Sequence, residues 1–378
     1  MKQKTFPSVS VLISSYNHEK YIGSAIGSVL NQTSEDLEII VMDNGSTDKT
    51  SVEIKKIKDD RLRSYRFEEN VGISRALNFG LEKAKGEYIC YFGSDDIYLP
   101  EKLEKQVAYL DSHPRVGAIF SYADFINESG NIFTDENHPF AVMNQHTNQN
   151  RYKWLNYFFY KCRWLWHPSM MIRKPVYKSL GKHDPRLAQI HDFDLGMRLS
   201  LNYEIHIIQE PLVQFRIREG NMNASANTIQ AQVRSMFEFA HVLKNYLTIK
   251  SVDEFLRIFP EESKRHSDIT RNELIPFYIA RLALTVPHVF HQKFALDTLF
   301  DLLKNPSTAG LLEKYCNFSY SDFIRLTGKY DLYHVQHIDF QENKIKILTN
   351  ENIRLNKTSA QIKSLVKKLL PFVMRKKL

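Results

Sequence analysis

Asp95 and Asp96 are the pair of residues whose type and spacing most directly suggest chemistry in this chain of 378 residues. Adjacent carboxylates repel one another unless a cation or hydrogen-bond donors compensate. Mg²⁺ and Mn²⁺ bind such oxygen ligands together with the phosphate oxygens of a substrate. The pair therefore predicts a metal site that holds a phosphorylated substrate. On these residues alone, the alternative is that they cap the next helix, which is a common role for aspartate.

Polar side chains also follow two other segments that we predict to be strands. Ser14 and Tyr16 come after the apolar segment 9–13, and Asp43 ends the segment 37–42. Open α/β sheets bind ligands outside the carboxyl ends of their strands, so we expect these residues to meet Asp95 at one edge. The first of these turns has no Gly-x-Gly-x-x-Gly pattern, and the chain has no Walker A loop, which argues against a dinucleotide-binding protein or a P-loop NTPase.

The elements that must position these residues alternate between strand and helix patterns. Strands are predicted at residues 9–13, 37–42, 62–67, 87–92 and 116–121, with helical patterns between them. This alternation predicts an α/β domain with a mainly parallel sheet flanked by helices. Two closing strands are expected at 205–208 and 212–217, and from about Asn221 the pattern is wholly helical. We predict a boundary near Gly220, with domains at 1–220 and 221–340 and a tail at 341–378.

Five segments, in order, resemble glycosyltransferase family 2: residues 8–17, 38–48, 70–80, 86–96 and 191–199. Each segment is weakly specific, but the ordered set is a strong match over about the first 220 residues. The resemblance implies a GT-A fold with a mixed, mainly parallel sheet and a nucleotide-sugar donor, usually a UDP-sugar. It also implies a divalent metal (Mn²⁺ or Mg²⁺), inversion at the anomeric carbon, and a glycan or glycolipid acceptor of the bacterial surface.

The resemblance assigns roles to single positions. Asp43 matches the carboxylate that accepts a hydrogen bond from the ring N–H of the base, and Asp192 matches the proposed general base. The alternative for Asp192 is a helix N-cap, and Asp194 is the lesser candidate for the base. The positions expected to contact the donor are Ser14, Tyr16, Asp43, Asn70, Gly72, Asn78, Asp95 and His167, and those expected to bind the metal are Asp95 and Asp96. For His167, a structural role is the alternative.

Four positions depart from the family pattern. Gly93 stands where many relatives have the first acid of the aspartate motif, and His191 replaces a glutamate before the expected base. Leu77 replaces a common arginine, and Asn44 replaces a frequent aspartate. Gly93 keeps a catalytically degenerate, scaffold-like protein open as an alternative function. The enzymatic alternative is a nucleotidyltransferase, although residues 14–17 lack the Gly-rich, basic loop that such an enzyme usually needs.

The segment 154–166 is rich in aromatic residues. Tyr157, Trp164 and Trp166 are candidates for a platform on which a sugar ring stacks. Aromatic runs more often fill a hydrophobic core, which is the alternative for all three residues.

The net charge of +8 is confined to the tail, since residues 341–378 contain ten Lys or Arg and two acidic residues. A uniformly basic, nucleic-acid-binding domain is therefore excluded. Apolar residues at 362, 365, 366, 369 and 373 share one helical face, beside several lysines. This pattern predicts either a helix that binds an anionic membrane surface or one that docks on protein, and Pro371 is expected to kink or end it. We expect a cytoplasmic protein, for which the inner membrane face, through this tail, and a second copy of the chain in a homodimer are both candidate partners.

Overall fold

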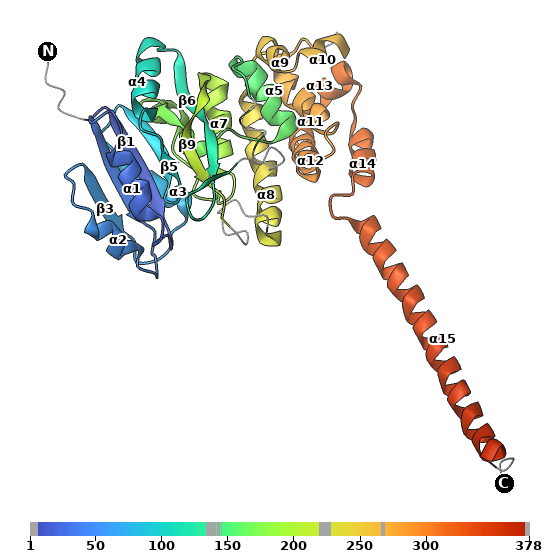
Figure 1. Ribbon diagram of the computed structural model, residues 1–378. Helices are drawn as coiled ribbons and strands as arrows, with labels where there is room; N and C mark the ends of the chain where they lie inside the picture. The colour runs from blue at the N-terminus through green and yellow to red at the C-terminus, as the bar shows by residue number, and fades with distance from the viewer. Residues whose placement is uncertain are drawn as a thin grey trace, which may run out of the picture. The chain divides into compact units, whose positions relative to one another are not determined.

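The computed structural model describes residues 7–133, 141, 144, 146–218, 228–265 and 269–374. The chain forms two compact units, Met1–Thr298 and Leu299–Leu378 (Figure 1). The first unit contains the whole sheet and the first helices that follow it. The predicted boundary near Gly220 lies outside the described residues, and the three predicted domains remain predictions.

The first unit is built on a mixed sheet in the order β3-β2-β1-β4-β8-β6-β9-β5, with β7 paired to β6. The neighbours β1 to β4 run parallel, β6 runs parallel to β9, and β5, β7 and β8 pair antiparallel. The strands are β1 (Val9–Ser15), β2 (Leu37–Asp43), β3 (Leu62–Arg66), β4 (Tyr88–Gly93), β5 (Ile97–Tyr98), β6 (Val116–Ile126), β7 (Ile132–Phe133), β8 (Met171–Arg173) and β9 (Glu204–Arg216).

Helices cover both faces of this sheet, which explains why β1 and β2 are mostly apolar and almost fully buried. Val9, Val11 and Ile13 share a core with residues of α1. On the opposite face, Gly80 of α3 lies against Met42 and Leu12, with no room for a Cβ. The helices of this part are α1 (Ile22–Leu30), α2 (Thr50–Lys56), α3 (Ile73–Lys83), α4 (Lys102–Ser112), α5 (Arg151–Lys161), α6 (Val176–Leu180) and α7 (His191–Asn202).

The described residues after 227 contain helices and connecting segments, as predicted. They include α8 (Ile229–Val242), α9 (Val252–Ile258), α10 (Pro260–Arg265), α11 (Ile275–Ala283) and α12 (Val289–Leu303). The second unit contains α13 (Pro306–Cys316), α14 (Tyr320–Lys329) and the long helix α15 (Val335–Met374). Among the helices that the structure describes, none combines the length and apolar composition that a membrane span requires.

One local prediction was wrong, and another was wrong in part. The two expected closing strands form the single strand β9, because the pairing with β6 shifts its register instead of breaking: Ser121 pairs with Ile208, and Tyr122 pairs with Pro211. Pro211 is tolerated at this irregularity, where a ladder hydrogen bond is already lost. Helix α15 continues to Met374, so Pro371 does not end it, and the kink expected there as the alternative stays a prediction.

Candidate functional site

The carboxyl ends of β1, β2 and β4 bring the first predicted residues together. The parallel register sets Ser14 beside Met42 and Gly93, and Ser15 beside Asp43. The turns that follow are tied to each other, since the backbone N–H of Asn44 donates to the carbonyl of Ser15 at 2.8 Å. Tyr16 is 43% exposed at this edge. The structure therefore places Ser14, Tyr16, Asp43 and Asp95 around one edge, as the parallel sheet predicts.

Asp43 has an open hydrogen-bond acceptor in a buried position. Its side chain is buried, and Oδ1 accepts from the backbone N–H of Ser46 at 3.0 Å. Oδ2 has no hydrogen-bond partner among the described residues, although Arg66 Nε lies 3.7 Å away. Buried acceptors are rarely left unpaired, because the lost hydration is not replaced. An N–H group of a bound base would satisfy this oxygen.

Asn70 and Gly72 shape the loop in front of α3. Asn70 Oδ1 accepts from Asn44 Nδ2 at 3.1 Å and from the backbone N–H of Gly72 at 2.9 Å. Gly72 has φ +84°, which favours glycine, and it precedes the first residue of α3. Asn78 bonds to both backbone groups of His183, at 2.8 and 3.0 Å. These contacts give Asn78 a positioning role in this structure.

Asp95 and Asp96 have different surroundings. Asp96 is buried, and its Oδ1 accepts from the backbone N–H of Arg216 at 2.9 Å. Its Oδ2 lies 2.5 Å from the place that a Cβ on Gly93 would occupy, so the missing side chain at 93 makes room for this carboxyl group. Burial and the neighbouring Asp95 raise the pKa of Asp96 well above its usual value. Helix α4 begins after Glu101, so neither aspartate caps it.

A divalent metal fits this pair only with help from the substrate. Asp95 is half-buried, with Oδ2 4.0 Å from Arg218 Nη1. The described part of the chain contains no group of three or more His, Cys, Asp or Glu side chains arranged to hold an ion. Mg²⁺ commonly binds one or two carboxylates together with substrate phosphates and water. Asp95 is the carboxylate better placed for that role, since Asp96 is enclosed.

Two arginines beside Asp95 were missed by the sequence patterns. Arg216 Nε donates to the main-chain oxygen of Asp95 at 2.7 Å. The guanidinium group of Arg216 lies 4.9 Å from the ring centre of Tyr21, and that of Arg218 lies 5.5 Å from it. His18 bonds to Arg218 Nη1 at 2.8 Å through Nε2 and to Ser94 Oγ at 2.6 Å through Nδ1. Burial lowers the pKa of His18. Positive charge at the end of β9 suits a diphosphate.

Asp192 and Asp194 are clearly distinguished by their contacts. Asp192 lies in the first turn of α7, is half-buried, and accepts from the backbone N–H of Phe193 at 2.8 Å. The N-cap of α7 is Ile190, so Asp192 is not the cap. Asp194 is buried and bonds to Arg198 at 2.6 Å and to Asn245 at 2.9 Å. Asp192 is therefore the carboxylate of this pair that retains capacity for a further contact.

Glu238 of α8 holds the loop that leads to Asp192, and no sequence pattern indicated it. Its carboxylate is 2% exposed. It accepts three backbone N–H bonds: from Ala188 at 2.8 Å, from Gln189 at 2.9 Å and from Ile190 at 3.0 Å. Hydrogen bonds to a charged acceptor are among the strongest in proteins. A helix beyond the sheet therefore fixes the start of α7.

His167 belongs to a cluster of histidines behind Asp192. Its ring stacks on Tyr91 at 5.3 Å and lies 5.5 Å from the ring of His191. His191 Nδ1 is 3.4 Å from His183 Nδ1. Burial lowers the pKa of His167 to about 4, and Asp192 offsets part of this effect. His167 Nε2 is buried and lacks a hydrogen-bond partner within the described ranges. The ring is therefore neutral at pH 7, with one nitrogen open to a ligand or to water.

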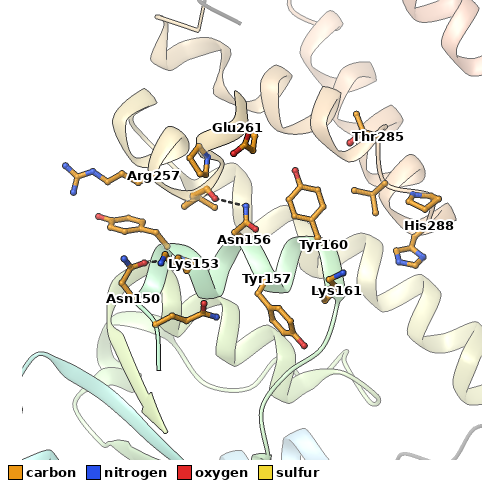
Figure 2. Close-up of a pocket in the computed structure, with 16 residues that line it drawn as sticks. Asn150, Lys153, Asn156, Tyr157, Tyr160, Lys161, Arg257, Glu261, Thr285 and His288 are labelled. Atoms are coloured by element: carbon orange, nitrogen blue, oxygen red, sulfur yellow. Dashed lines mark hydrogen bonds between the residues drawn. The ribbon is translucent and has the colours of Figure 1, made fainter. Parts of the chain in front are cut away.

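The aromatic segment divides between a core and a pocket. Trp164 and Trp166 are buried, and Trp166 Nε1 donates to Asn144 at 2.7 Å, so both fill the core. Tyr157 lines a pocket of about 1110 Å³ bounded by α5, the α9–α10 region and residues 285–288. Figure 2 shows Asn156 and Tyr160 extending from α5 toward α9 and α10, while Tyr157 extends on the other side of α5.

Comparisons with known proteins decide the family. The model of glycosyl transferase family 2 matches residues 10–180. The protein named "Uncharacterized glycosyltransferase MJ1057" of Methanocaldococcus jannaschii is 35% identical over 216 residues, which are 56% of this chain and 71% of the relative. The chain belongs to glycosyltransferase family 2. A second relative of this family 2 enzyme, "Uncharacterized glycosyltransferase RT0329" of Rickettsia typhi, is 28% identical over 291 residues, covering 75% of this chain and 87% of the relative.

Solved structures confirm the fold of this glycosyltransferase. S. aureus TarS 1–349 in complex with UDP-GlcNAc has a TM-score of 0.55 and 20% sequence identity, over 78% of this chain and 88% of TarS. The same TarS segment in complex with UDP gives a TM-score of 0.54. The likeness shows that the predicted GT-A type of fold, with a mixed and mainly parallel sheet, is present here.

Proposed function

We propose that this glycosyltransferase moves a hexose or N-acetylhexosamine from a UDP-sugar to a hydroxyl group of a surface-glycan acceptor, with inversion at the anomeric carbon. The donor assignment rests on Asp43 Oδ2, a buried acceptor that has no hydrogen-bond partner among the described residues. It lies at the edge where Asp95 also lies. A uracil ring offers an N–H to such an acceptor. The UDP and UDP-GlcNAc complexes of TarS, which has the same fold, support this choice of donor.

The diphosphate is expected to lie beside Asp95 and the end of β9. Asp95 would hold a divalent metal, Mn²⁺ or Mg²⁺, which neutralises negative charge on the leaving diphosphate when it is bound. Arg216 and Arg218 add fixed positive charge on the same side of the site. Arg216 also keeps the two aspartates in place, because it donates to Asp95 and Asp96 from its side chain and backbone.

Asp192 is the proposed general base. The acceptor hydroxyl attacks the anomeric carbon, its proton passes to the Asp192 carboxylate, and the bond from the anomeric carbon to the UDP oxygen breaks. Attack opposite the leaving group inverts the configuration. Asp194 does not serve in this role, because Arg198 and Asn245 occupy its oxygens. His167, with its neutral ring behind Asp192, is placed to orient the base or a substrate hydroxyl.

The pocket of Figure 2 is proposed to hold outer sugars of a glycan acceptor, because α5, which lines it, begins beside Glu204, at the opposite end of β9 from Arg216 and Asp95. Tyr160 presents apolar ring surface with a polar tip, and Lys153 and Lys161 add donors along the same helix. Its volume exceeds the ~300–1,000 Å³ of a cleft for one drug-sized ligand, which suits several sugar units. With a lipid-linked acceptor, the enzyme would work on the cytoplasmic face of the membrane, where the basic residues of the tail would favour anionic lipid.

The proposal is tested with the full chain and a panel of nucleotide sugars, with and without Mn²⁺. We expect release of UDP from one UDP-sugar and a strong increase with the metal. Release of pyrophosphate from a nucleoside triphosphate would instead indicate a nucleotidyltransferase. Titration of UDP by calorimetry is the second readout, since an enzyme that needs its acceptor still binds donor. Failure of both release and binding would contradict the proposed function and favour a scaffold.

A further inference from the structure

Helix α15 of the second unit has apolar side chains that no neighbouring group covers in the described residues. It runs for 40 residues, Val335–Met374. Ile338, Ile345, Leu348 and Leu355 are 52%, 61%, 54% and 68% exposed. Helical stability in proteins comes mostly from packing of an apolar face, and a regular pattern much longer than 25 residues suggests a coiled coil. A partner for this helix is therefore expected.

The apolar residues of α15 repeat every seven positions. With Ile345 at position a and Leu348 at position d, eight of the eleven a and d positions from 338 to 373 are apolar. The a positions are Ile338, Ile345, Asn352, Ser359, Val366 and Val373, and the d positions are Gln341, Leu348, Leu355, Ile362 and Leu369. This seam is sustained over about five heptads, more than the three or four that indicate a coiled coil.

The residue types at these positions identify the partner. β-Branched residues at a and mostly leucine at d favour two parallel strands, and a single asparagine at a, here Asn352, fixes register and oligomeric state. We propose that α15 pairs with α15 of a second copy of this chain in a parallel, two-stranded coiled coil. The proposal goes beyond the transferase function and does not depend on it.

The charges on either side of the seam agree with this pairing. In a parallel dimer, each g position faces the next e position of the partner helix. The g–e pairs are His337–Glu342, Lys344–Thr349, Glu351–Asn356, Thr358–Lys363 and Leu365–Leu370, and none of them has two charges of the same sign. Six of the ten basic residues of the tail, among them Lys346, Lys357 and Lys368, fall at the outer positions b, c and f. They stay exposed to solvent in the dimer.

The size of the seam is sufficient for a stable dimer. Full burial of one Leu, Ile or Val side chain removes roughly 60–120 Å² of apolar surface from water. Eight such residues give roughly 500–1,000 Å² per chain, against about 800 Å² per partner in a standard interface. At 1.5 Å per residue the seam is about 54 Å long.

A membrane surface fits the same helix less well. Gln341, Asn352 and Ser359 lie along the centre of the seam, where an inserted helix would carry them into the apolar layer. Three further exposed apolar residues, Phe340, Ile347 and Ile353, lie at c, c and b and are scattered around the polar side. A surface-binding helix instead needs one broad apolar face.

The test is the mass of the full chain in solution, by sedimentation velocity at micromolar concentration. We expect a dimer, and we expect Leu348→Glu with Leu355→Glu to halve the mass. The matched control is Asn350→Glu with Lys357→Glu, which adds acidic residues at two f positions with the same spacing and should leave the dimer intact. Orientation is tested with Gln341→Cys, because only parallel helices bring two copies of position 341 together for oxidative cross-linking.

A monomeric wild-type chain would overturn the proposal. A dimer that survives the two d-position changes would also overturn it, since the contact would then lie elsewhere. A monomer that co-sediments with phosphatidylserine vesicles, and loses this binding in the d-position variant, would show that lipid is the partner. Release or binding of UDP is measured separately, so failure of the transferase proposal leaves these outcomes unchanged.

Discussion

Glu238→Gln is the substitution that most sharply tests how the helical part supports the site. The carboxylate receives three backbone N–H bonds of 2.8 to 3.0 Å, two of them on Oε2 and one on Oε1. Glutamine has the same shape but carries an NH₂ group in place of one oxygen. At least one of the three N–H groups then faces a donor, and the remaining bonds lose their charged acceptor.

The size of the effect follows from these bonds. A hydrogen bond to a charged group contributes about 1.5–3 kcal/mol, and a buried donor left unpaired costs about 1–3 kcal/mol. We therefore expect Glu238→Gln to lower the free energy of unfolding by about 2–4 kcal/mol. Because the loop 188–190 leads directly into α7 and Asp192, we also expect a fall in kcat with little change in UDP affinity.

The assays are urea unfolding, steady-state kinetics and UDP titration. Glu262→Gln is the matched control, since Glu262 is also a buried glutamate outside the sheet, at 4% exposure, and its Oε2 lies 3.8 Å from Arg281 Nη2 of α11. It should reduce stability without a selective fall in kcat. An unchanged unfolding free energy in Glu238→Gln would refute the energetic argument. A normal kcat in a variant that is destabilised as expected would refute the positioning role.

Three further predictions concern the expected uracil-binding site, the hydrophobic core and the histidine cluster. Asp43→Asn puts an NH₂ group in the place of the unpaired acceptor oxygen. Calorimetry should therefore find UDP binding weakened about 10- to 100-fold, equivalent to about 1.4–3 kcal/mol. Unchanged affinity would count against binding of the uracil ring at Asp43. A Cβ at Gly196 would lie 2.1 Å from the Trp164 ring, so Gly196→Ala should lower the unfolding free energy by about 1–3 kcal/mol or more, and a neutral result would mean that the tryptophan moves freely. Burial holds the pKa of His167 at about 4, below the ~6.5 of an unfolded histidine, so the unfolded chain takes up a proton first as the pH falls. The unfolding free energy should therefore drop by roughly 3 kcal/mol between about pH 6.5 and pH 4, and His167→Gln should remove that part of the slope in urea titrations at several pH values.

The parts of the fold that local patterns determine were predicted well. Apolar runs correctly placed β1, β2 and β4, because a strand covered by helices on both sides is nearly continuously apolar. A helix was predicted between the strands at 62–67 and 87–92, and α3 spans Ile73–Lys83 between Gly72 and Ala84. The edge that joins Ser14, Asp43 and Asp95 follows from the parallel order of the strands alone.

The parts that depend on distant contacts could not be predicted. Arg216 and Arg218 reach Asp95 only because β9 returns beside β5, more than a hundred residues later in the chain. Glu238 carries no local motif, and its role exists only in the folded loop. The enclosure of Asp96 also needed the structure, since it depends on the space left by Gly93. The roles of the predicted site residues remain predictions until they are measured.

The most direct test of the central claim is a comparison of Asp192→Asn with the wild type in two measurements on the same preparation. One measurement is transfer from the UDP-sugar identified by the donor panel, and the other is the affinity for UDP. A general base contributes typically 10²–10⁴-fold to a rate, so we expect transfer to fall by about that factor while UDP affinity stays the same. A variant that transfers sugar at the wild-type rate would contradict the account.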